Sequence, residues 1–167
     1  KILFGDLNND TYSDIIIFLS VEKQIIVHLG KSDGRFSASP DNVMDATVGS
    51  AAASLADFND DGVLDLVYAG GQGQFVVAFG LGNGSFHSER IFSASSPNHF
   101  SIIIPCDLNE DGLTDLVLAK FPAIQHVVML NRGHGTFWSA LYLPENVLQY
   151  TMDMKIGHLN DDNHLDM

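Results

Sequence analysis

The stretch ADFNDDGVLDLVYA, residues 56–69, decides the fold of this chain, because its acidic part returns at a regular interval. The nine-residue windows that carry this repeat start at positions 6, 57, 107 and 158, and they read DLNNDTYSD, DFNDDGVLD, DLNEDGLTD and HLNDDNHLD. The steps between them are 51, 50 and 51 residues. Fourteen of the 21 Asp and Glu residues lie in these windows, which cover only 36 of 167 positions. The acidic residues therefore mark an internal repeat of about 50 residues.

A second motif repeats in step with the first. It reads HLGKSDGRF from position 28, AFGLGNGSF from position 78 and MLNRGHGTF from position 129. Each copy carries a glycine 27 or 28 residues after the start of its acidic window. Two motifs that share one period of this length are typical of a solenoid, a propeller or an array.

Each repeat contains short β-rich segments separated by turn residues. The acidic windows are followed by unbroken apolar runs such as residues 66–69, which are typical of strands covered on both faces. A third strand is expected in QIIVHLG, QFVVAFG and QHVVML, which begin at positions 24, 74 and 125. The dipeptide Asn83-Gly84 and its counterparts favour a tight hairpin turn, and the phenylalanine two residues after each glycine is expected to start a fourth strand. No segment shows a sustained period of 3.6, so we expect almost no helix.

Four antiparallel strands in a repeat of about 50 residues match one blade of a β-propeller. We therefore predict an all-β fold in which residues 1–167 form a single propeller segment. The repeats are expected at approximately 1–47, 48–98, 99–147 and, in part, 148–167. Because propellers typically close with 4–8 blades, three blades and part of a fourth predict a fragment of a larger ring, such as a seven-bladed one.

The acidic windows place oxygen donors at positions 1, 3, 5 and 9, with glycine at position 6 in the middle two. A calcium loop begins in this way, with glycine for a sharp turn and a backbone carbonyl at position 7 among the ligands. Position 12 carries no Glu, which excludes an EF-hand. Crowded carboxylates destabilise a fold unless a cation lies among them. The predicted Ca²⁺ ligands are Asp6, Asn8, Asp10, the Tyr12 carbonyl and Asp14; Asp57, Asn59, Asp61, the Val63 carbonyl and Asp65; and Asp107, Asn109, Asp111, the Leu113 carbonyl and Asp115.

The alternative interpretation of these windows is that Asp, Asn and Gly recur because they make good turns. The first and last windows are also weaker candidates than the middle two. Thr11 occupies the glycine position of the first window, and a β-branched residue is poorly suited to a positive φ, so we expect weaker binding there. In the last window His158 replaces the first Asp and Asn163 replaces glycine, and no ion is assigned to that loop.

Composition excludes several classes of function. Eight Lys and Arg residues against 21 Asp and Glu give a formal net charge of −13, whereas nucleic-acid binding draws on clustered Lys and Arg. The single cysteine, Cys106, allows neither an internal disulfide nor a cysteine-based zinc site, and all-oxygen donors favour Ca²⁺ over zinc or copper. No apolar run approaches the ~20 residues of a membrane span, so no span is expected in this segment.

Three segments resemble the FG-GAP and VCBS-type repeat family, the blades of integrin-alpha-like β-propellers. They are GDLNNDTYSDIIIF from Gly5, ADFNDDGVLDLVYA from Ala56 and CDLNEDGLTDLVLA from Cys106, and the resemblance spans essentially the whole chain. It implies that the acidic loop joins the first two strands of a blade and holds Ca²⁺. It also implies an extracellular or cell-surface location and adhesion to, or recognition of, a protein or carbohydrate ligand. The Gly-Ala-Pro stretch of the family is absent after the second strand, which moves the sequence toward the VCBS-like members.

We therefore expect a calcium-binding scaffold for extracellular recognition or adhesion rather than an enzyme. The carboxylates are periodic, and a repeated ligand role fits such a pattern better than a unique catalytic site does. Two alternatives stay open. One is the propeller domain of a secreted enzyme of the polysaccharide lyase or lipid hydrolase type, and the other is a structural spacer attached to another module.

Overall fold

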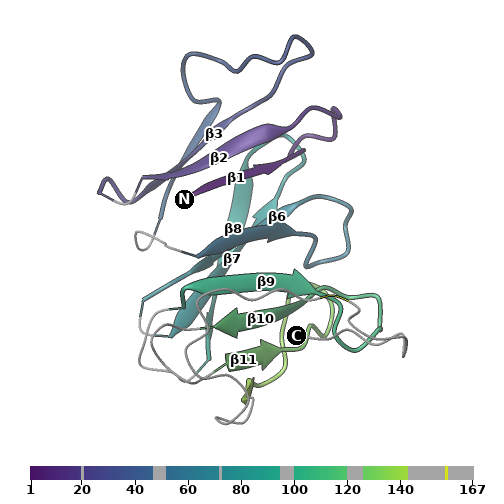
Figure 1. The fold of residues 1–167 in the computed structure, drawn as a ribbon. Coiled ribbons are helices and arrows are strands. Elements are labelled where there is room, and N and C mark those ends of the chain that lie inside the picture. The colour runs from purple at the N-terminus through teal and green to yellow at the C-terminus, as the bar shows by residue number, and fades with distance from the viewer. Residues whose placement is uncertain are drawn as a thin grey trace.

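The computed structural model describes residues 1–19, 21–46, 52–71, 73–94, 100–119, 126–142 and 157. In these parts the chain forms twelve β-strands and no helix, so they contain no helix that could cross a membrane. The strands make three four-stranded antiparallel sheets that follow one another in chain order (Figure 1). The predicted all-β fold built from four-stranded blades is therefore confirmed.

Within each sheet the strands are ordered as in the chain, so each blade is a simple meander. The first blade consists of β1 (Ile2–Gly5), β2 (Asp14–Leu19), β3 (Gln24–His28) and β4 (Asn42–Asp45). The second consists of β5 (Ala53–Ala56), β6 (Asp65–Ala69), β7 (Gln74–Gly80) and β8 (Phe86–Ser93). The third consists of β9 (Ile102–Cys106), β10 (Asp115–Ala119), β11 (His126–Met129) and β12 (Leu141–Tyr142). The predicted repeat boundaries, and all of the partial repeat except residue 157, lie outside the described residues.

The fourth strand starts where it was predicted in only one of the three blades. Phe86 opens β8, whereas Phe36 and Phe137 each form a single isolated bridge before the ladder resumes at β4 and β12. In the first blade the interruption has a local cause, because Pro40 has no backbone N–H to donate to a ladder. The Asp41 carboxylate accepts a backbone N–H at 2.8 Å there, in place of a strand carbonyl.

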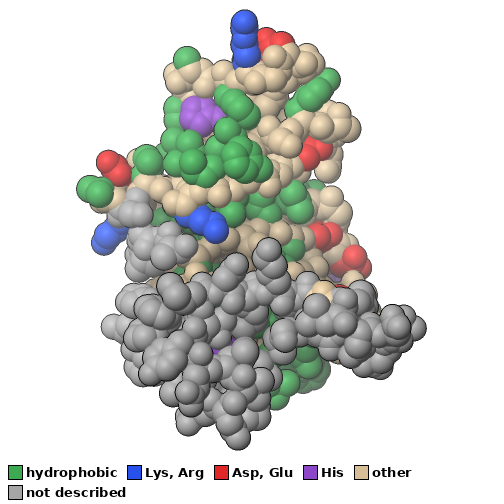
Figure 2. Space-filling model, viewed as in Figure 1, with side chains coloured by type: hydrophobic (Ala, Val, Ile, Leu, Met, Phe, Trp, Pro, Cys, Tyr) green, Lys and Arg blue, Asp and Glu red, His purple; other side chains and the backbone are tan. Residues whose placement is uncertain are grey.

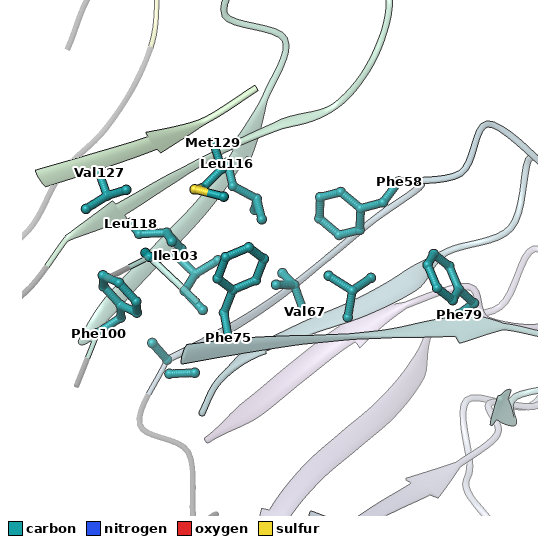
Figure 3. Packing of buried hydrophobic residues seen from close by; sticks show 14 residues of the cluster. Phe58, Val67, Phe75, Phe79, Phe100, Ile103, Leu116, Leu118, Val127 and Met129 are labelled. Atoms are coloured by element: carbon teal, nitrogen blue, oxygen red, sulfur yellow. The ribbon is translucent and has the colours of Figure 1, made fainter. Parts of the chain in front are cut away.

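The blades pack face to face, and buried apolar side chains fill the two seams between them. Side chains of the first seam are Ile16, Phe18, Ile25 and Val27 on the first blade and Leu66, Tyr68, Val76 and Ala78 on the second. In the second seam, Phe75 points toward Ile103 and Leu118 of the third blade (Figure 3). Full burial of such a side chain contributes roughly 1.5–3 kcal/mol, so the seams supply much of the stability that holds the blades together.

Burial along the second strand of each blade depends on whether both faces are packed. Every residue of β6 and β10 is buried. In β2 the burial alternates: Ile16 and Phe18 face the first seam, and Ile15 and Ile17 are half-buried on the opposite face. Two-sided cover, predicted from the unbroken apolar runs, therefore holds for β6 and β10 and is wrong for β2.

The outer face of the first blade is an exposed apolar surface. Ile2 and Phe4 on β1 are 53% and 65% exposed, and Val43 on β4 is 55% exposed. Strand register places Ile2, Ile17 and Val43 in one row across this sheet, through Ile26. Figure 2 shows hydrophobic side chains gathered over the first blade. At the position of Ile2, the second blade carries Ala53, which is only 5% exposed because it packs in the first seam.

We expect this outer face to make the protein self-associate, because a contiguous exposed apolar patch is an aggregation liability. The double variant Ile2→Ser with Phe4→Ser should sediment as a smaller species at high concentration. Its free energy of unfolding should change little, since both side chains are already largely in water. Val21→Ser is the matched control, because Val21 is 90% exposed in the β2–β3 turn. Equal sedimentation velocity for the double variant and the wild-type protein would contradict the prediction.

Candidate metal centre

Each acidic loop joins the first two strands of its blade, as the family resemblance implies. Residues 6–13, 57–64 and 107–114 connect β1 to β2, β5 to β6 and β9 to β10. The three loops share one backbone conformation, with left-handed residues at positions 4 and 6 of the window. The φ angles are 57° at Asn9, 64° at Asp60 and 60° at Glu110 for position 4, and 72° at Thr11, 80° at Gly62 and 84° at Gly112 for position 6. The loops are therefore three copies of one structure.

Thr11 is the residue that fits this shared conformation least well. A left-handed residue other than glycine costs roughly 1–2 kcal/mol. Glycine at this position would remove that cost, but part of the gain in stability would be lost because glycine has greater freedom in the unfolded chain. We expect Thr11→Gly to raise the free energy of unfolding by about 0.5–1 kcal/mol in a urea titration. The matched control is Ser13→Gly, since Ser13 is exposed in the same loop without a positive φ. A loss of stability equal to that of Ser13→Gly would contradict the prediction.

Position 1 of each loop is a carboxylate that accepts backbone N–H groups from the middle of the same loop. Asp57 accepts the N–H of Asp60 and of Gly62, each at 2.7 Å. Gly112 donates to Asp107 at 2.9 Å, and Thr11 donates to Asp6 at 2.7 Å. In all, four backbone N–H groups donate to Asp57, whereas two donate to Asp6 and two to Asp107. Because a carboxylate can accept about four hydrogen bonds, this residue closes the turn in every loop, and Asp6 and Asp107 retain capacity for another partner.

Positions 3 and 5 are joined side chain to side chain. The amide Nδ2 of Asn59 donates to Asp61 Oδ2 at 2.8 Å, and the backbone N–H of Val63 donates to Asp61 Oδ1 at the same distance. The first and third loops repeat the amide contact at 2.8 Å. The predicted ligands at these positions are therefore brought together in every loop.

Position 9 has a different environment from the other three. Asp65 is fully buried, and its two oxygens accept the N–H groups of Phe58 at 2.9 Å and Gly80 at 2.8 Å. Asp14 and Asp115 are also fully buried and make the equivalent two bonds. This carboxylate therefore ties the start of its own loop to the end of the third strand.

Burial and neighbouring charge make ionisation of the position-9 carboxylates unfavourable. Burial raises the pKa of Asp65 to about 6, although the N–H groups of Gly80 and Phe58 lower it, and the charges of Asp61 and Asp57 raise it further. The pKa values of Asp14 and Asp115 are raised in the same way, with burial again the largest cause. A cation among the carboxylates would relieve this repulsion.

The donors that position 9 needs were not predicted from the sequence. Two of them are Gly30 and Gly80, where a Cβ atom would collide with the carbonyls of Ser13 and Leu64. The third is Asn131, whose side-chain Nδ2 also donates to the Phe58 carbonyl at 2.9 Å and so links two blades. The signal was present, since these residues share the third place of the second repeated motif.

The acidic loops also contact the following blade. The hairpin-turn N–H of Gly84 donates to the Leu7 carbonyl at 3.3 Å, and the N–H of Gly135 donates to the Phe58 carbonyl at 3.0 Å. Phe58 and Phe137 pack edge to face, with ring centroids 6.0 Å apart. The two repeated motifs therefore meet across each seam, which explains why they keep the same period.

The residues fit a calcium ion by their chemistry, and the arrangement in the structure is a hydrogen-bonded one. Carboxylate, amide and backbone carbonyl oxygens are the ligands that Ca²⁺ takes. Across the described residues, no three His, Cys, Asp or Glu side chains lie close enough together to form a metal site by themselves. Within each loop, positions 1, 3 and 5 form one network, and position 9 lies behind it against the backbone. The fourth predicted window, residues 158–166, lies outside the described residues.

Four-stranded blades that pack face to face, each with an acidic loop between its first two strands, define the chain as a β-propeller repeat protein. The model of the FG-GAP-like repeat matches residues 6–68 and 57–118. The chain therefore belongs to the FG-GAP-like repeat family, and the resemblance found in the sequence is confirmed.

Two known proteins show what the chain is similar to. It is 24% identical over 192 residues to a T-cell immunomodulatory protein homolog from Plasmodium yoelii yoelii, in a match that covers 98% of this chain and 27% of the relative. It also matches the solved structure of an Agrocybe aegerita lectin described as recognising non-reducing terminal N-acetylglucosamine. That match has a TM-score of 0.64 at 23% identity and covers 87% of this chain and 38% of the lectin. The chain thus spans well under half of either protein, and the likeness to the lectin concerns the fold.

Proposed function

We propose that this chain is part of a calcium-stabilised recognition scaffold of an extracellular or cell-surface protein. The observation that carries the proposal is the three-fold recurrence of one acidic loop with a buried carboxylate behind it. Family membership supports the propeller scaffold, and the lectin with the same fold supports a recognition role with a carbohydrate or protein ligand.

In the proposed mechanism the residues of each loop bind the calcium ion and hold the loop rigidly against the strands of its blade. In the second loop, Asp57, Asn59, Asp61, the Val63 carbonyl and Asp65 would hold the ion. Ca²⁺ would supply positive charge that neutralises the clustered carboxylates. Asp65 fixes the loop to the end of β7 through Gly80, so the position of the loop is transmitted to the blade edge where a ligand can be recognised.

The proposal predicts three calcium sites in the described residues. Isothermal titration of chelator-treated protein should give about three ions per chain, with dissociation constants near the ~10⁻⁴–10⁻³ M of extracellular modules. Asp61→Asn removes a charge from one loop only and should reduce the stoichiometry by one. Asp60→Asn is the matched control, since Asp60 is exposed in the same loop and is not one of its predicted ligands. If the wild-type protein shows no saturable calcium binding, the proposal is wrong.

An enzymatic role receives less support from the residues that could carry one. Burial raises the pKa of the Cys106 thiol to about 11, with further contributions from the charges of Asp115 and Asp107, and a protonated thiol is a poor nucleophile. The buried carboxylates bond to backbone N–H groups in the same way in all three blades. A spacer role differs from recognition only in lacking a ligand site, and a candidate for such a site lies at the second seam.

A further inference from the structure

A polar hollow of about 310 Å³ opens at the seam between the second and third blades. The hollow lies beside the second acidic loop, and the residues named below as its lining belong to the described parts of the chain. Its lining consists of Asn59 and Asp61 from that loop, Phe79 from β7, His87 and Arg90 from β8, and His134 from the hairpin turn of the third blade. Residues of two blades therefore meet in one cavity.

The basic residues of this hollow are not dictated by the repeat. Arg90 pairs with Val77 in the sheet, and the residues at the same place in the other blades are Asn42 and Leu141. At the place of His87 the other blades carry Ser37 and Trp138. In a repeat protein the fold favours the same residue type at equivalent positions of each repeat. Residues that differ between blades, such as Arg90 and His87, can therefore serve a role that is specific to one blade.

The side chain of Arg90 is held in place before any ligand arrives. Its Nη1 donates to the carbonyls of His134 at 3.0 Å and Gly135 at 3.2 Å. Its guanidinium lies over the Phe79 ring, 5.2 Å from the centroid. Among the described residues no acceptor engages Nε or Nη2, which together form one edge of the guanidinium. That edge is the planar fork that binds a carboxylate in bidentate fashion.

The opposite wall of the hollow carries acceptors and an amide. Asp61 and Asn59 line it. When one Asp61 oxygen and the Asn59 oxygen hold an ion, the other Asp61 oxygen can still accept a hydrogen bond from a hydroxyl group, and the Asn59 Nδ2 can still donate one. His87 is exposed and can donate or accept through its ring nitrogens. An anion alone would meet Asp61 unfavourably, whereas a ligand with a carboxylate at one end and hydroxyl groups at the other suits both walls.

We propose that this seam hollow binds a small hydroxy-carboxylate, with the carboxylate on the Nε/Nη2 edge of Arg90. Its hydroxyl groups would bond to His87, to the Asn59 Nδ2 amide and to the one Asp61 oxygen that a bound calcium ion leaves free. The proposal deepens the recognition role proposed above and rests on it. The carboxylate of the ligand is the group that the hollow selects.

The test is a titration of the protein with D-glucuronate, followed in ¹H–¹⁵N spectra at the Arg90 Nε–Hε signal. Glucuronate should shift that signal in a saturable way, and D-glucose, which lacks the carboxylate, should bind at least tenfold more weakly. Arg90→Gln, followed at the backbone amide signals of His87 and His134, should weaken glucuronate binding at least tenfold. Arg132→Gln is the matched control, because Arg132 is an exposed arginine that stacks on Trp138 in the third blade, and it should leave the affinity unchanged.

His87→Ala gives a second variant whose side chain has no role in the seam carbonyl contacts, and it should weaken binding several-fold. Equal binding of glucose and glucuronate, equal binding of inorganic phosphate and glucuronate, or no saturable shift would each overturn the proposal. Measuring the titration with and without calcium separates the two hypotheses. If calcium binding persists while glucuronate fails, the seam site falls and the calcium-stabilised scaffold stands.

Discussion

Asp65→Asn is expected to lower the free energy of unfolding by about 2 kcal/mol. Its carboxylate accepts the N–H groups of Phe58 and Gly80 with no exposure to solvent. An amide has only one oxygen, so one of these buried donors would lose its acceptor and face an NH₂ group, at a cost of about 1–3 kcal/mol. The charge of Asp65 is itself unfavourable, since burial raises its pKa to about 6. Relief of that charge offsets part of the loss without reversing it.

The matched control for this change is Asp60→Asn. It removes the same charge from the same loop, but Asp60 is exposed and its own N–H, rather than its side chain, makes the bond to Asp57. Substitutions at such surface positions usually change stability by less than 0.5 kcal/mol. Urea unfolding at neutral pH measures both variants. A gain in stability for Asp65→Asn would show that charge repulsion outweighs the two backbone bonds.

The blade architecture could be predicted from the sequence because it depends on local and periodic signals. Short apolar runs fix β2, β6 and β10, and the turn residues between them fix the number of strands per repeat. The fourth strand was less predictable. Its start depends on Pro40 and Asp41 in the first blade, where a missing donor and a side-chain acceptor interrupt the ladder. The two-sided burial of a strand likewise depends on the neighbouring blade, which the run of apolar residues does not specify.

The site was predictable in its position and in its donor types, and not in how the donors are used. Spacing placed the candidate ligands in one loop. It did not reveal that Asp65 and its equivalents bond to the backbone of a strand some 15 residues later, because that contact depends on how closely two strands approach. Gly80 permits the approach, since a side chain there would meet the Leu64 carbonyl. Calcium itself stays a prediction.

Calcium is expected to raise the melting temperature of the protein by about 10 °C. For dissociation constants of ~10⁻⁴–10⁻³ M, calcium at about 5 mM adds roughly 1–2 kcal/mol for each occupied loop. Three loops together give about 3–6 kcal/mol, and 1 kcal/mol corresponds to about 2–4 °C for a domain of this size. Thermal unfolding followed by circular dichroism in excess chelator and in calcium measures the shift. Magnesium is the control ion and should give a smaller shift, because it dehydrates reluctantly.

A variant with all three position-5 charges removed separates ion binding from turn formation. Asn in place of Asp10, Asp61 and Asp111 keeps an acceptor for the backbone N–H that each carboxylate now binds. It gives up the acceptor for the Nδ2 of the position-3 Asn, a loss that costs little because water can reach these loop side chains and replace the bond. If the loops exist only as turns, the variant should match or exceed the wild-type stability in both conditions, because repulsion is reduced. If they hold calcium, it should match the wild-type protein in chelator and lose most of the calcium-dependent shift. Melting temperatures that are the same in chelator and calcium for the wild-type protein would leave only the first explanation.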